Sequence, residues 1–216
     1  NFNFSIDPIF SAIANAYWSS TPMAQSNPDV GQEAWACEFG TGRDGPVFVE
    51  ADGVTVRCVR DANGLPTLPD TGQTECYDNA GNGLDCSSFF CPGQDGSIVP
   101  GCANDANRFV DNGDGTVTDT CTGLMWQQES GDPDPEPGVQ GVLWCNALDY
   151  ADTLTLGDHD DWRVPDINEL NSLVDRGNFN FSIDPIFSAI ANAYWSSTPM
   201  AQSNPDVGQE AWACEF

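Results

Sequence analysis

The stretch AYWSSTPMAQSNPDVGQEAWACEF at residues 16–39 occurs a second time, without a single change, at residues 193–216. Followed outward from there, the identity reaches back to the first residue, so that residues 1–39 equal residues 178–216. The offset between the copies is 177 positions. A period of this length has the size of a domain and is far longer than the roughly 20–50 residues of a solenoid repeat. The sequence therefore predicts one type of domain, repeated or polymerised.

The chain is strongly acidic, with 33 Asp and Glu residues against 6 basic residues, all of them Arg, and a net charge of −27. A field of this sign repels nucleic acid and anionic membrane surfaces, so neither is expected as a partner. High net charge is also typical of disorder, but seven Trp, twelve Phe and nine Cys supply core-forming and cross-linking side chains. No apolar run approaches the roughly 18 residues of a membrane span, and membrane insertion is not expected.

The cysteines indicate an oxidising, extracellular compartment. Cys37 and Cys214 are the same position of the repeat, so one unit contains eight cysteines, an even number typical of four disulfides. Eight cysteines allow roughly a hundred pairings, but two short loops favour Cys76–Cys86 and Cys91–Cys102. A metal site is the weaker interpretation because no CxxC motif occurs and the only histidine is His159. The candidates for disulfides are Cys58, Cys76, Cys86, Cys91, Cys102, Cys121, Cys145 and Cys214.

Two segments have the pattern of helices. In PDINELNSLVDRG (165–177), Asp166 and Glu169 form a capping box, an apolar stripe follows, and Gly177 is expected to end the helix. VLWCNALDYADTL (142–154) has a second apolar face. Alternating patterns predict strands at AYWSST, EAWACEF, PVFVEA (46–51), VTVRCVR (54–60), RFVD (108–111) and TVTD (116–119). The predicted fold class is α+β, with short helices beside antiparallel strands.

The sequence contains a series of motifs, namely NGDGTVTDTCTGLMW (112–126), DWRVPDINELNSLVD (161–175), YWSST (194–198), AWACEFGTG (34–42), VRCVR (56–60) and the lead-in LPDTGQTECYDNAGNGLDC (68–86). Their order resembles the Lcl C-terminal-domain-like family, a domain of bacterial secreted and surface proteins long catalogued without a function. The resemblance implies a C-type-lectin-like fold with short antiparallel strands, two short helices and long disulfide-held loops. Val164 and Asp166 stand where the family usually has Leu and Thr, and Cys145 lies earlier than the family's common Cys, so the family's disulfide pattern is not carried over.

The family order shows that the chain is out of phase with its domains. A complete domain runs from the lead-in through YWSST and AWACEF to VRCVR. Here AWACEF stands at 211–216, whereas its continuation, GTGRDGPVFVEADGVTVRCVR, lies at 40–60. Residues 1–61 are therefore expected to be the C-terminal part of one domain copy, 62–104 the Cys/Gly/Pro-rich lead-in of the next copy, and 105–216 the body of that next copy.

Two physical arrangements explain why the chain is out of phase with its domains. In the first, the domains form a covalent tandem array; in the second, separate subunits join head to tail, each lending terminal strands from within 40–60 to a neighbour's sheet. Both create a heterologous contact that need not close, which leads to fibres. A lone subunit of the second kind exposes a strand edge that favours self-assembly. An artificial duplication of the segment is a third explanation of the repeat.

The sequence LPDTG at 68–72 fits the sorting signal that sortases cleave. That signal needs an apolar segment and basic residues after it, and the residues that follow are QTECYDNAG. The chain also has no Lys to serve as an acceptor amine. A turn between domains is therefore the preferred interpretation of this Pro- and Gly-containing stretch.

The acidic stretch DNGDGTVTD (111–119) suggests a calcium loop, but its acids do not follow the ligand spacing of an EF-hand. A hairpin around NGDG is expected instead, with Val110 facing Val117 and Arg108 near Asp119. A second acidic group consists of Asp158, Asp160 and Asp161. A weak calcium site there is left open, and no other cofactor is predicted.

No residue pattern indicates an enzyme. His159 has no nucleophile near it in sequence, so a solvated histidine is expected. Ser196, Ser197 and Thr198 lack the GxSxG context of a hydrolase nucleophile and are expected to pair as strand hydroxyls. The cysteines do not match the redox active site of formylglycine-generating enzymes, which share the implied fold superfamily.

The repeated aromatic residues are the candidates for glycan binding, because aromatic rings stack on sugars in lectin-like folds. A place in the core is the preferred alternative for Trp in alternating strands of a small domain. The residues are Tyr17, Trp18 and Trp35 and their second copies Tyr194, Trp195 and Trp212. Asn3 and Asn180 each lie in a glycosylation sequon, a weak signal in a bacterial protein.

The sequence as a whole predicts the structural repeating subunit of a secreted, disulfide-stabilised bacterial filament or fibrous surface adhesin, without catalytic residues. Its expected partner is a further copy of itself. The alternative is a multivalent lectin-like adhesion module whose partners are glycans and whose affinity comes from many weak sites.

Overall fold

The computed structural model describes residues 16–23, 33–38, 43–48, 55–56, 69, 71–78, 82–87, 94–97, 107–131, 143–178, 181–190, 193–199 and 211–216. The chain divides into two compact units. Unit 1 comprises residues 1–103 together with 176–179, and unit 2 comprises residues 104–175 and 180–216. The boundary between the units at residues 103–104 lies close to the predicted start of the domain body at 105, but residues 176–179 of that predicted body belong to unit 1.

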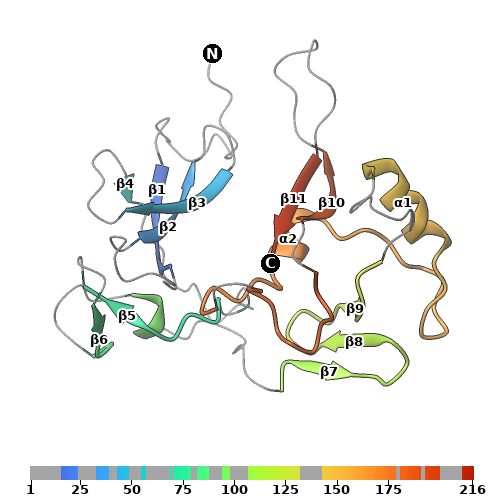
Figure 1. The fold of residues 1–216 in the computed structure, drawn as a ribbon, viewed down its shortest axis with the longest axis horizontal. Helices are drawn as coiled ribbons and strands as arrows, with labels where there is room; N and C mark the ends of the chain where they lie inside the picture. Colours follow the sequence, from blue (N-terminus) through green and yellow to red (C-terminus); the bar gives the residue numbers. More distant parts are fainter. Residues whose placement is uncertain are drawn as a thin grey trace, which may run out of the picture. The chain divides into compact units, whose positions relative to one another are not determined.

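Unit 1 contains a four-stranded sheet with the order β3-β2-β1-β4 (Figure 1). Strands β1 (Ala16–Pro22), β2 (Glu33–Glu38) and β3 (Arg43–Phe48) are antiparallel, and β4 (Thr55–Val56) runs parallel to β1. Strand β3 begins three residues before the predicted 46–51. It includes Pro46, which has no N–H to donate, and this suits its position as the outermost strand.

The second copy of the repeated sequence forms the same strand pair in unit 2. Strands β10 (Ala193–Pro199) and β11 (Ala211–Glu215) are antiparallel and form a two-stranded sheet. Tyr194 pairs with Cys214 in β10–β11 as Tyr17 pairs with Cys37 in β1–β2, and both pairs contain the same irregularity before their proline. Identical sequences thus adopt one register in two different surroundings.

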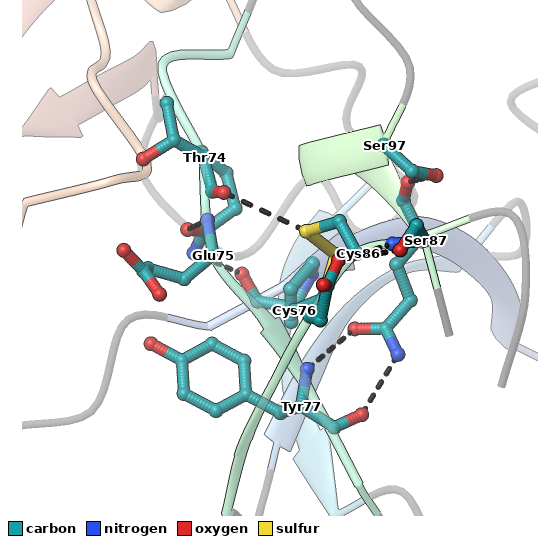
Figure 2. Close-up of a disulfide and its surroundings, with 11 residues drawn as sticks. Thr74, Glu75, Cys76, Tyr77, Cys86, Ser87 and Ser97 are labelled. Carbon is teal, nitrogen blue, oxygen red and sulfur yellow. Dashed lines mark hydrogen bonds between the residues drawn. A yellow bond between two sulfur atoms is a disulfide. The ribbon is translucent and has the colours of Figure 1, made fainter. Parts of the chain in front are cut away.

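The lead-in of the second copy folds around a disulfide between Cys76 and Cys86, whose Cα atoms are 5.3 Å apart (Figure 2). This bond was predicted and is confirmed. It joins strand β5 (Cys76–Tyr77) to the turn that follows strand β6 (Gly83–Leu84), and the side chain of Gln94 makes two hydrogen bonds to the backbone of Tyr77. Short strands of two residues have little stability of their own, so the covalent bond and these side-chain contacts hold the loop.

Buried polar contacts join this lead-in to the strands of the first copy within unit 1. Asp95, which begins a 3₁₀ helix (Asp95–Ser97), accepts hydrogen bonds from the hydroxyls of Thr21 and Thr71 and is 5% exposed. The amide of Gln73 donates to the Pro22 carbonyl over 3.0 Å. Because buried polar groups are costly without partners, these bonds fix the lead-in against β1.

Unit 2 begins with a three-stranded antiparallel sheet of β7 (Phe109–Asp111), β8 (Thr116–Asp119) and β9 (Met125–Gln127). The predicted hairpin forms, but the predicted facing of Val110 and Val117 is wrong: Val110 pairs with Thr118. A register change of one residue moves side chains to opposite faces. Val117 is fully buried, whereas Val110 is 45% exposed. The amide of Asn112 donates to Thr116, so the loop between paired residues is 113–115, one residue shorter than NGDG.

Both predicted helices are present in unit 2. Helix α1 spans Trp144–Thr153 and buries Ala151. Helix α2 spans Ile167–Asn171, and its Asp166–Glu169 capping box is confirmed. The helix ends earlier than the predicted Gly177, because the amides of Leu173 and Val174 turn back to carbonyls three residues before them. Gly177 therefore lies beyond the helix.

The core of unit 2 lies between the hairpin and the turns that follow α2. Its main cluster consists of Phe109, Val117, Leu173, Ile183 and Phe187, and the rings of Phe109 and Phe187 meet edge to face at 5.1 Å. A second cluster joins Leu170 and Val174 of the α2 region to Cys214 of β11. Strand β11 thus packs against α2 through one of its faces.

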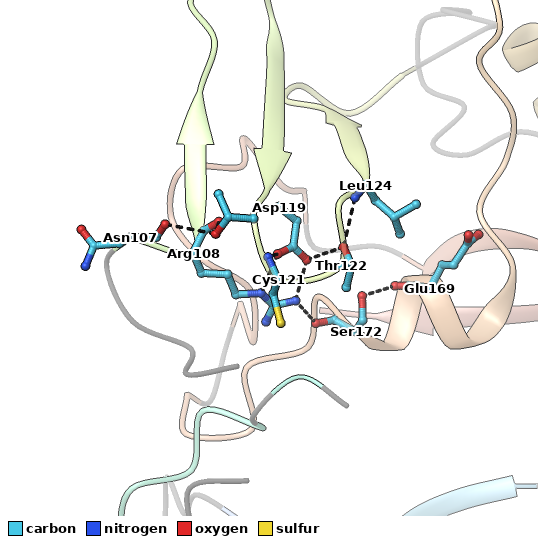
Figure 3. Close-up of polar contacts among 9 residues, drawn as sticks. Asn107, Arg108, Asp119, Cys121, Thr122, Leu124, Glu169 and Ser172 are labelled. Atoms are coloured by element: carbon cyan, nitrogen blue, oxygen red, sulfur yellow. Dashed lines mark hydrogen bonds and ion pairs between the residues drawn. The ribbon is translucent and has the colours of Figure 1, made fainter. Parts of the chain in front are cut away.

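A buried ion pair adjoins this core (Figure 3). Arg108 and Asp119 are 2.8 Å apart, and their side chains are 1% and 0% exposed. Asp119 also accepts from the Cys121 amide and the Thr122 hydroxyl, and Arg108 donates to the Ser172 carbonyl at 2.8 Å. The predicted proximity of Arg108 and Asp119 is confirmed. Because each charge is fully hydrogen-bonded, the pair satisfies the condition under which buried ions are tolerated.

The remaining cysteines differ in their state. Cys121 is also disulfide-bonded. Cys145 and Cys214, both predicted to be bridged, carry thiols in this structure, which corrects the prediction for these two. Cys145 is exposed on α1, whereas Cys214 packs with Leu170 as a small core side chain, so the two are in different surroundings. Cys58, Cys91 and Cys102 lie outside the described residues, as do Asn3 and Asn180.

The predicted α+β class is confirmed, since short strands and two helices make up the described structure. Within that part of the chain, no helix is long and apolar enough to cross a membrane.

The buried ion pair gives a prediction for stability. Replacing Asp119 with Ala leaves the Arg108 charge buried without its carboxylate, which should lower the free energy of unfolding of unit 2 by about 3–5 kcal/mol. Denaturant unfolding followed by circular dichroism measures this loss, and Asp160→Ala, at an exposed position, is the matched control. A loss of the same size in both variants would contradict the role of the pair.

The same pair predicts how stability depends on pH. Burial raises the pKa of Asp119, but hydrogen bonds from Arg108, Cys121 and Thr122 outweigh it and hold the pKa below its ordinary value of 3.8. The ionised pair therefore stabilises the fold fully above that value, and the stabilisation is lost as the pH falls through the lower folded pKa. Asp119→Ala should flatten this acid limb, which unfolding curves at several pH values would show.

Candidate functional site

The acids of the DNGDGTVTD stretch, for which a hairpin was predicted in preference to a calcium loop, make hydrogen bonds within that hairpin. The carboxylate of Asp111 accepts from the Gly113 amide at 2.7 Å. That of Asp114 accepts from the amide and hydroxyl of Thr116, and the hydroxyl lowers the pKa of Asp114. Within the described residues, no group of three or more His, Cys, Asp or Glu side chains is placed to hold a metal ion. The hairpin carboxylates therefore act as turn-forming groups.

The loop that carries His159 is a tight turn. Leu156 and His159 exchange backbone hydrogen bonds of 3.0 and 3.1 Å, and Asp158 adopts a positive φ of 62°. The His159 ring meets the Trp162 ring edge to face at 6.5 Å. Asp158, Asp160 and Asp161 are all exposed around it. The residues form a solvated turn packed on an aromatic ring, and no nucleophile is positioned by the histidine in the bonds observed.

The hydroxyls of the second YWSST motif connect β10 to β11 and to α2. Ser196 is fully buried, and its hydroxyl donates to the Trp212 carbonyl at 2.8 Å. The Thr198 hydroxyl accepts from the amide of Ile167, the first residue of α2. Ser197 donates its backbone amide to the Pro165 carbonyl. The Ser196 contact agrees with the prediction of a strand hydroxyl that pairs across the sheet, whereas the Thr198 hydroxyl bonds to α2 and the observed bond of Ser197 is made by its backbone amide.

The repeated aromatic residues are mostly buried or half-buried. Tyr17 is 7% exposed in unit 1. In unit 2, the Tyr194 hydroxyl lies 2.7 Å from the Ser130 hydroxyl, and its ring packs against Phe216. Trp195 and Trp212 are half-buried. Tyr17 therefore lies in the core, as the preferred interpretation predicted, whereas Tyr194 and Trp195 also face an open space.

That space is a cleft of about 1430 Å³ within unit 2, between β9, α1 and the β10–β11 pair. It brings together residues that the sequence singled out separately, namely His159, Asp161, Tyr194 and Trp195. Gln127 donates to the Tyr150 hydroxyl at 3.0 Å on its wall. The indole N–H of Trp126, another lining residue, is buried and has no hydrogen-bond partner. The cleft thus combines several aromatic rings with one unsatisfied donor.

A second candidate feature is the edge of β11. In unit 1, β2 lies between β1 and β3, but β11, with the same sequence, is joined to β10 alone in its sheet. The difference is visible at single residues. Ala36 of β2 is 4% exposed, whereas its counterpart Ala213 of β11 is exposed. Within the described residues, the same strand sequence is therefore more exposed in unit 2 than in unit 1.

Arg176 makes structural contacts that the sequence analysis did not predict. It belongs to unit 1, where its guanidinium lies 3.8 Å from the centre of the Trp35 ring and 3.2 Å from the Asp44 carboxylate. Its backbone amide donates to the Thr71 carbonyl. Trp35 and Asp44 lie on the neighbouring strands β2 and β3, so one side chain holds both strands. The only signal in the sequence was its place among six basic residues.

Comparison with known proteins gives one match. The model of the Lcl C-terminal domain family matches residues 115–216. No curated protein and no solved structure matches the chain.

The contacts of Arg176 predict a local effect on unit 1. Arg176→Ala removes a cation–π contact and a partly exposed ion pair, together worth about 1–2 kcal/mol. Hydrogen exchange at the amides of β2 and β3 should become roughly 5–30-fold faster. The exchange rates in Arg176→Lys should lie between those of the unchanged protein and of Arg176→Ala. An ammonium keeps the charge but lacks the planar stacking of a guanidinium.

Arg163→Ala is the matched control for this experiment. Arg163 forms an exposed ion pair with Glu169 in unit 2 and lowers the pKa of that carboxyl. Its removal should leave exchange in β2 and β3 unchanged. Equal acceleration in both variants would contradict the proposed role of Arg176.

Proposed function

Because the chain belongs, through residues 115–216, to the Lcl C-terminal domain family, we propose that it is the structural repeating subunit of a bacterial extracellular filament or fibrous surface adhesin. The subunits are C-type-lectin-like domains, stabilised by disulfides and joined head to tail with a period of 177 residues. They are secreted or displayed on the cell surface. Their main partner is a further copy of the same domain.

The observation that carries this proposal is the repeat in sequence together with its repeat in structure. The two copies of the 39-residue segment are identical, and their strand pairs share one register. A fold that reproduces the same element at a fixed interval supports an assembly of equal units. Head-to-tail contacts between equal units need not close, so they lead to fibres.

The polar features of the chain fit an extracellular structural role. The Cys76–Cys86 bond and the bridged Cys121 favour an oxidising environment. A net charge of −27 keeps filaments soluble. The carboxylates of the hairpin and the YWSST hydroxyls make structural hydrogen bonds, and we therefore propose a protein without catalytic activity.

The aromatic cleft supports a second candidate function, the display of many weak glycan sites along the filament. Sugars stack on aromatic rings and satisfy polar groups around them, and the unsatisfied Trp126 N–H is such a group. One weak site per domain gains avidity when many domains are linked. This function is compatible with the structural one.

The filament proposal predicts the behaviour of protein isolated from the cells that make it. Native preparations should contain fibres with one axial repeat per domain, visible by negative-stain electron microscopy. The reduced, denatured mass then separates the two arrangements. Subunits that exchange strands should give one species near 19 kDa, scaled from 23.2 kDa for 216 residues. A covalent array should give a mass many times larger.

A native particle of one or two domains, with no fibres over a range of concentrations, would contradict the proposal. Reduction of the disulfides in native conditions serves as a control, because fibres held only by intermolecular Cys145 bridges would then dissolve. Fibres that persist would support assembly through the domains themselves.

The glycan proposal predicts that the chain binds specific saccharides on a glycan microarray. Trp126→Phe keeps an aromatic ring, although a smaller one than the indole, and removes the N–H donor, so it should weaken binding roughly tenfold, the value of one good hydrogen bond. Trp35→Phe, which lies in unit 1 away from the lining of the cleft, is the control. A blank array would contradict a lectin role and leave the structural role.

A further inference from the structure

Three buried polar side chains of unit 1, from three separate segments, meet beside the end of strand β1. Thr21 belongs to β1, Gln73 to the lead-in, and Asp95 to the 3₁₀ helix. Their exposed fractions are 6%, 3% and 5%. A hydroxyl, a carboxamide and a carboxylate are the groups that an acyl transfer needs, namely a nucleophile, an acyl group and a base.

The carboxylate of Asp95 is placed to accept the proton of Thr21. The Thr21 hydroxyl donates to Oδ2 of Asp95 at 2.9 Å, and the Thr71 hydroxyl donates to the same oxygen. A carboxylate in direct hydrogen-bond contact with a hydroxyl is the arrangement of a general base and its nucleophile. The Thr21–Asp95 pair therefore has the geometry to activate the threonine oxygen.

The carboxamide of Gln73 is held at both of its polar atoms. Its Oε1 accepts from the Glu75 amide at 2.9 Å, and its Nε2 donates to the Pro22 carbonyl at 3.0 Å. A backbone N–H aimed at an acyl oxygen stabilises the negative charge that develops there during nucleophilic attack. The bond to Pro22 also places the carboxamide beside the residue that directly follows Thr21.

Gly96 allows the close approach that brings Asp95 to this site. A Cβ atom at residue 96 would lie 2.8 Å from the Glu75 carbonyl oxygen and 2.8 Å from the Thr74 carbonyl carbon, both of them backbone atoms. The turn that carries Asp95 therefore packs directly on the backbone that follows Gln73. Any side chain at residue 96 would move the carboxylate away from the carboxamide.

The chain offers hydroxyls and no lysine amine as nucleophiles, because it contains no Lys. Two hydroxyls contact Asp95, and Thr21 is the better nucleophile for Gln73. Thr71 accepts the backbone amide of Gln73 at 3.3 Å, so its oxygen is directed toward the backbone of that residue. Thr21 approaches from a different strand, so its reaction would join two separate segments.

We propose that Thr21 and Gln73 react with each other to form an ester. Oγ1 of Thr21 attacks Cδ of Gln73 while its proton passes to Asp95, and the Glu75 amide stabilises the charge that develops on Oε1. The Cδ–Nε2 bond then breaks, the nitrogen takes the proton from Asp95, and ammonia leaves. The carboxylate is regenerated, and no cofactor or oxidant takes part. Burial of the site keeps out the water that would hydrolyse the ester.

The ester would join β1 of one predicted domain copy to the lead-in of the next. In a fibre, the bond would keep these two segments together under tension, and unlike a disulfide it would persist in reducing conditions. The inference does not depend on the filament proposal, because all the groups lie within unit 1 of a single chain.

Mass spectrometry of the full chain tests the ester. The reduced and denatured chain should be lighter than the mass calculated from its sequence by one molecule of ammonia. Trypsin cleaves after Arg, and residues 1–43 and 61–108 should remain joined as one branched species. Alkaline hydrolysis should separate the two peptides and convert the Gln73 side chain to a carboxylate. A chain of full mass without a branched species, or a bond at Thr71, would overturn the proposal.

Variants of the same chain assign the role of each group. Thr21→Val and Gln73→Glu each remove a reacting group and should abolish the branched species. Asp95→Asn keeps both reacting groups and should slow formation of the ester roughly 100-fold or more, the usual contribution of a general base. An unchanged rate in Asp95→Asn would overturn its role as the base. Because the branched species is sought first in the unchanged chain, a variant that fails to fold does not decide the test.

Thr198→Val is the matched control. Thr198 is the position of the repeat that corresponds to Thr21, but its hydroxyl accepts from the Ile167 amide. Its replacement should leave the branched species unchanged, and loss of that species would contradict the assignment to Thr21. The ester and the filament fail separately, since the mass of the isolated chain reports the ester whether or not fibres form.

Discussion

Every strand in a sheet presents two edges of N–H and C=O groups, and each edge needs a partner or water. The structure contains one strand sequence twice, once with both edges paired in β2 and once with a single strand neighbour in β11. The pairing with the preceding YWSST strand is the same in both copies, so it is the constant element of the repeat on which the proposed filament rests.

The predictions that succeeded depend on local sequence. The Asp166–Glu169 capping box, helix α1 and the Cys76–Cys86 bond each involve residues close in the chain, where spacing alone limits the geometry. The hairpin register was missed by one residue, because the number of residues in the loop depends on positive φ at Gly113 and Gly115 that the NGDG sequence does not specify uniquely. Arg176 could not be assigned, because its partner Asp44 is 132 positions away and no local pattern signals such a contact.

The acidic residues of the chain fall into distinct structural classes, although composition treats them alike. Asp119 is buried and fully bonded by Arg108 and its neighbours, so it is part of the core. Asp111 and Asp114 shape a turn, and Asp166 begins a helix. Asp95 connects the lead-in to β1 within unit 1. These carboxylates therefore help to specify the fold, whereas solubility depends on the other acidic residues, at the surface.

Pro46 has a consequence for the shape of any assembly built in this way. Proline has no backbone N–H to donate, and β3, which contains Pro46, is the outermost strand of its sheet. A strand that completes a neighbour's sheet therefore cannot template a further strand beside it. Sheets would grow to a fixed number of strands and stop, so the fibre would have a constant width and would resist the sideways stacking that leads to amyloid.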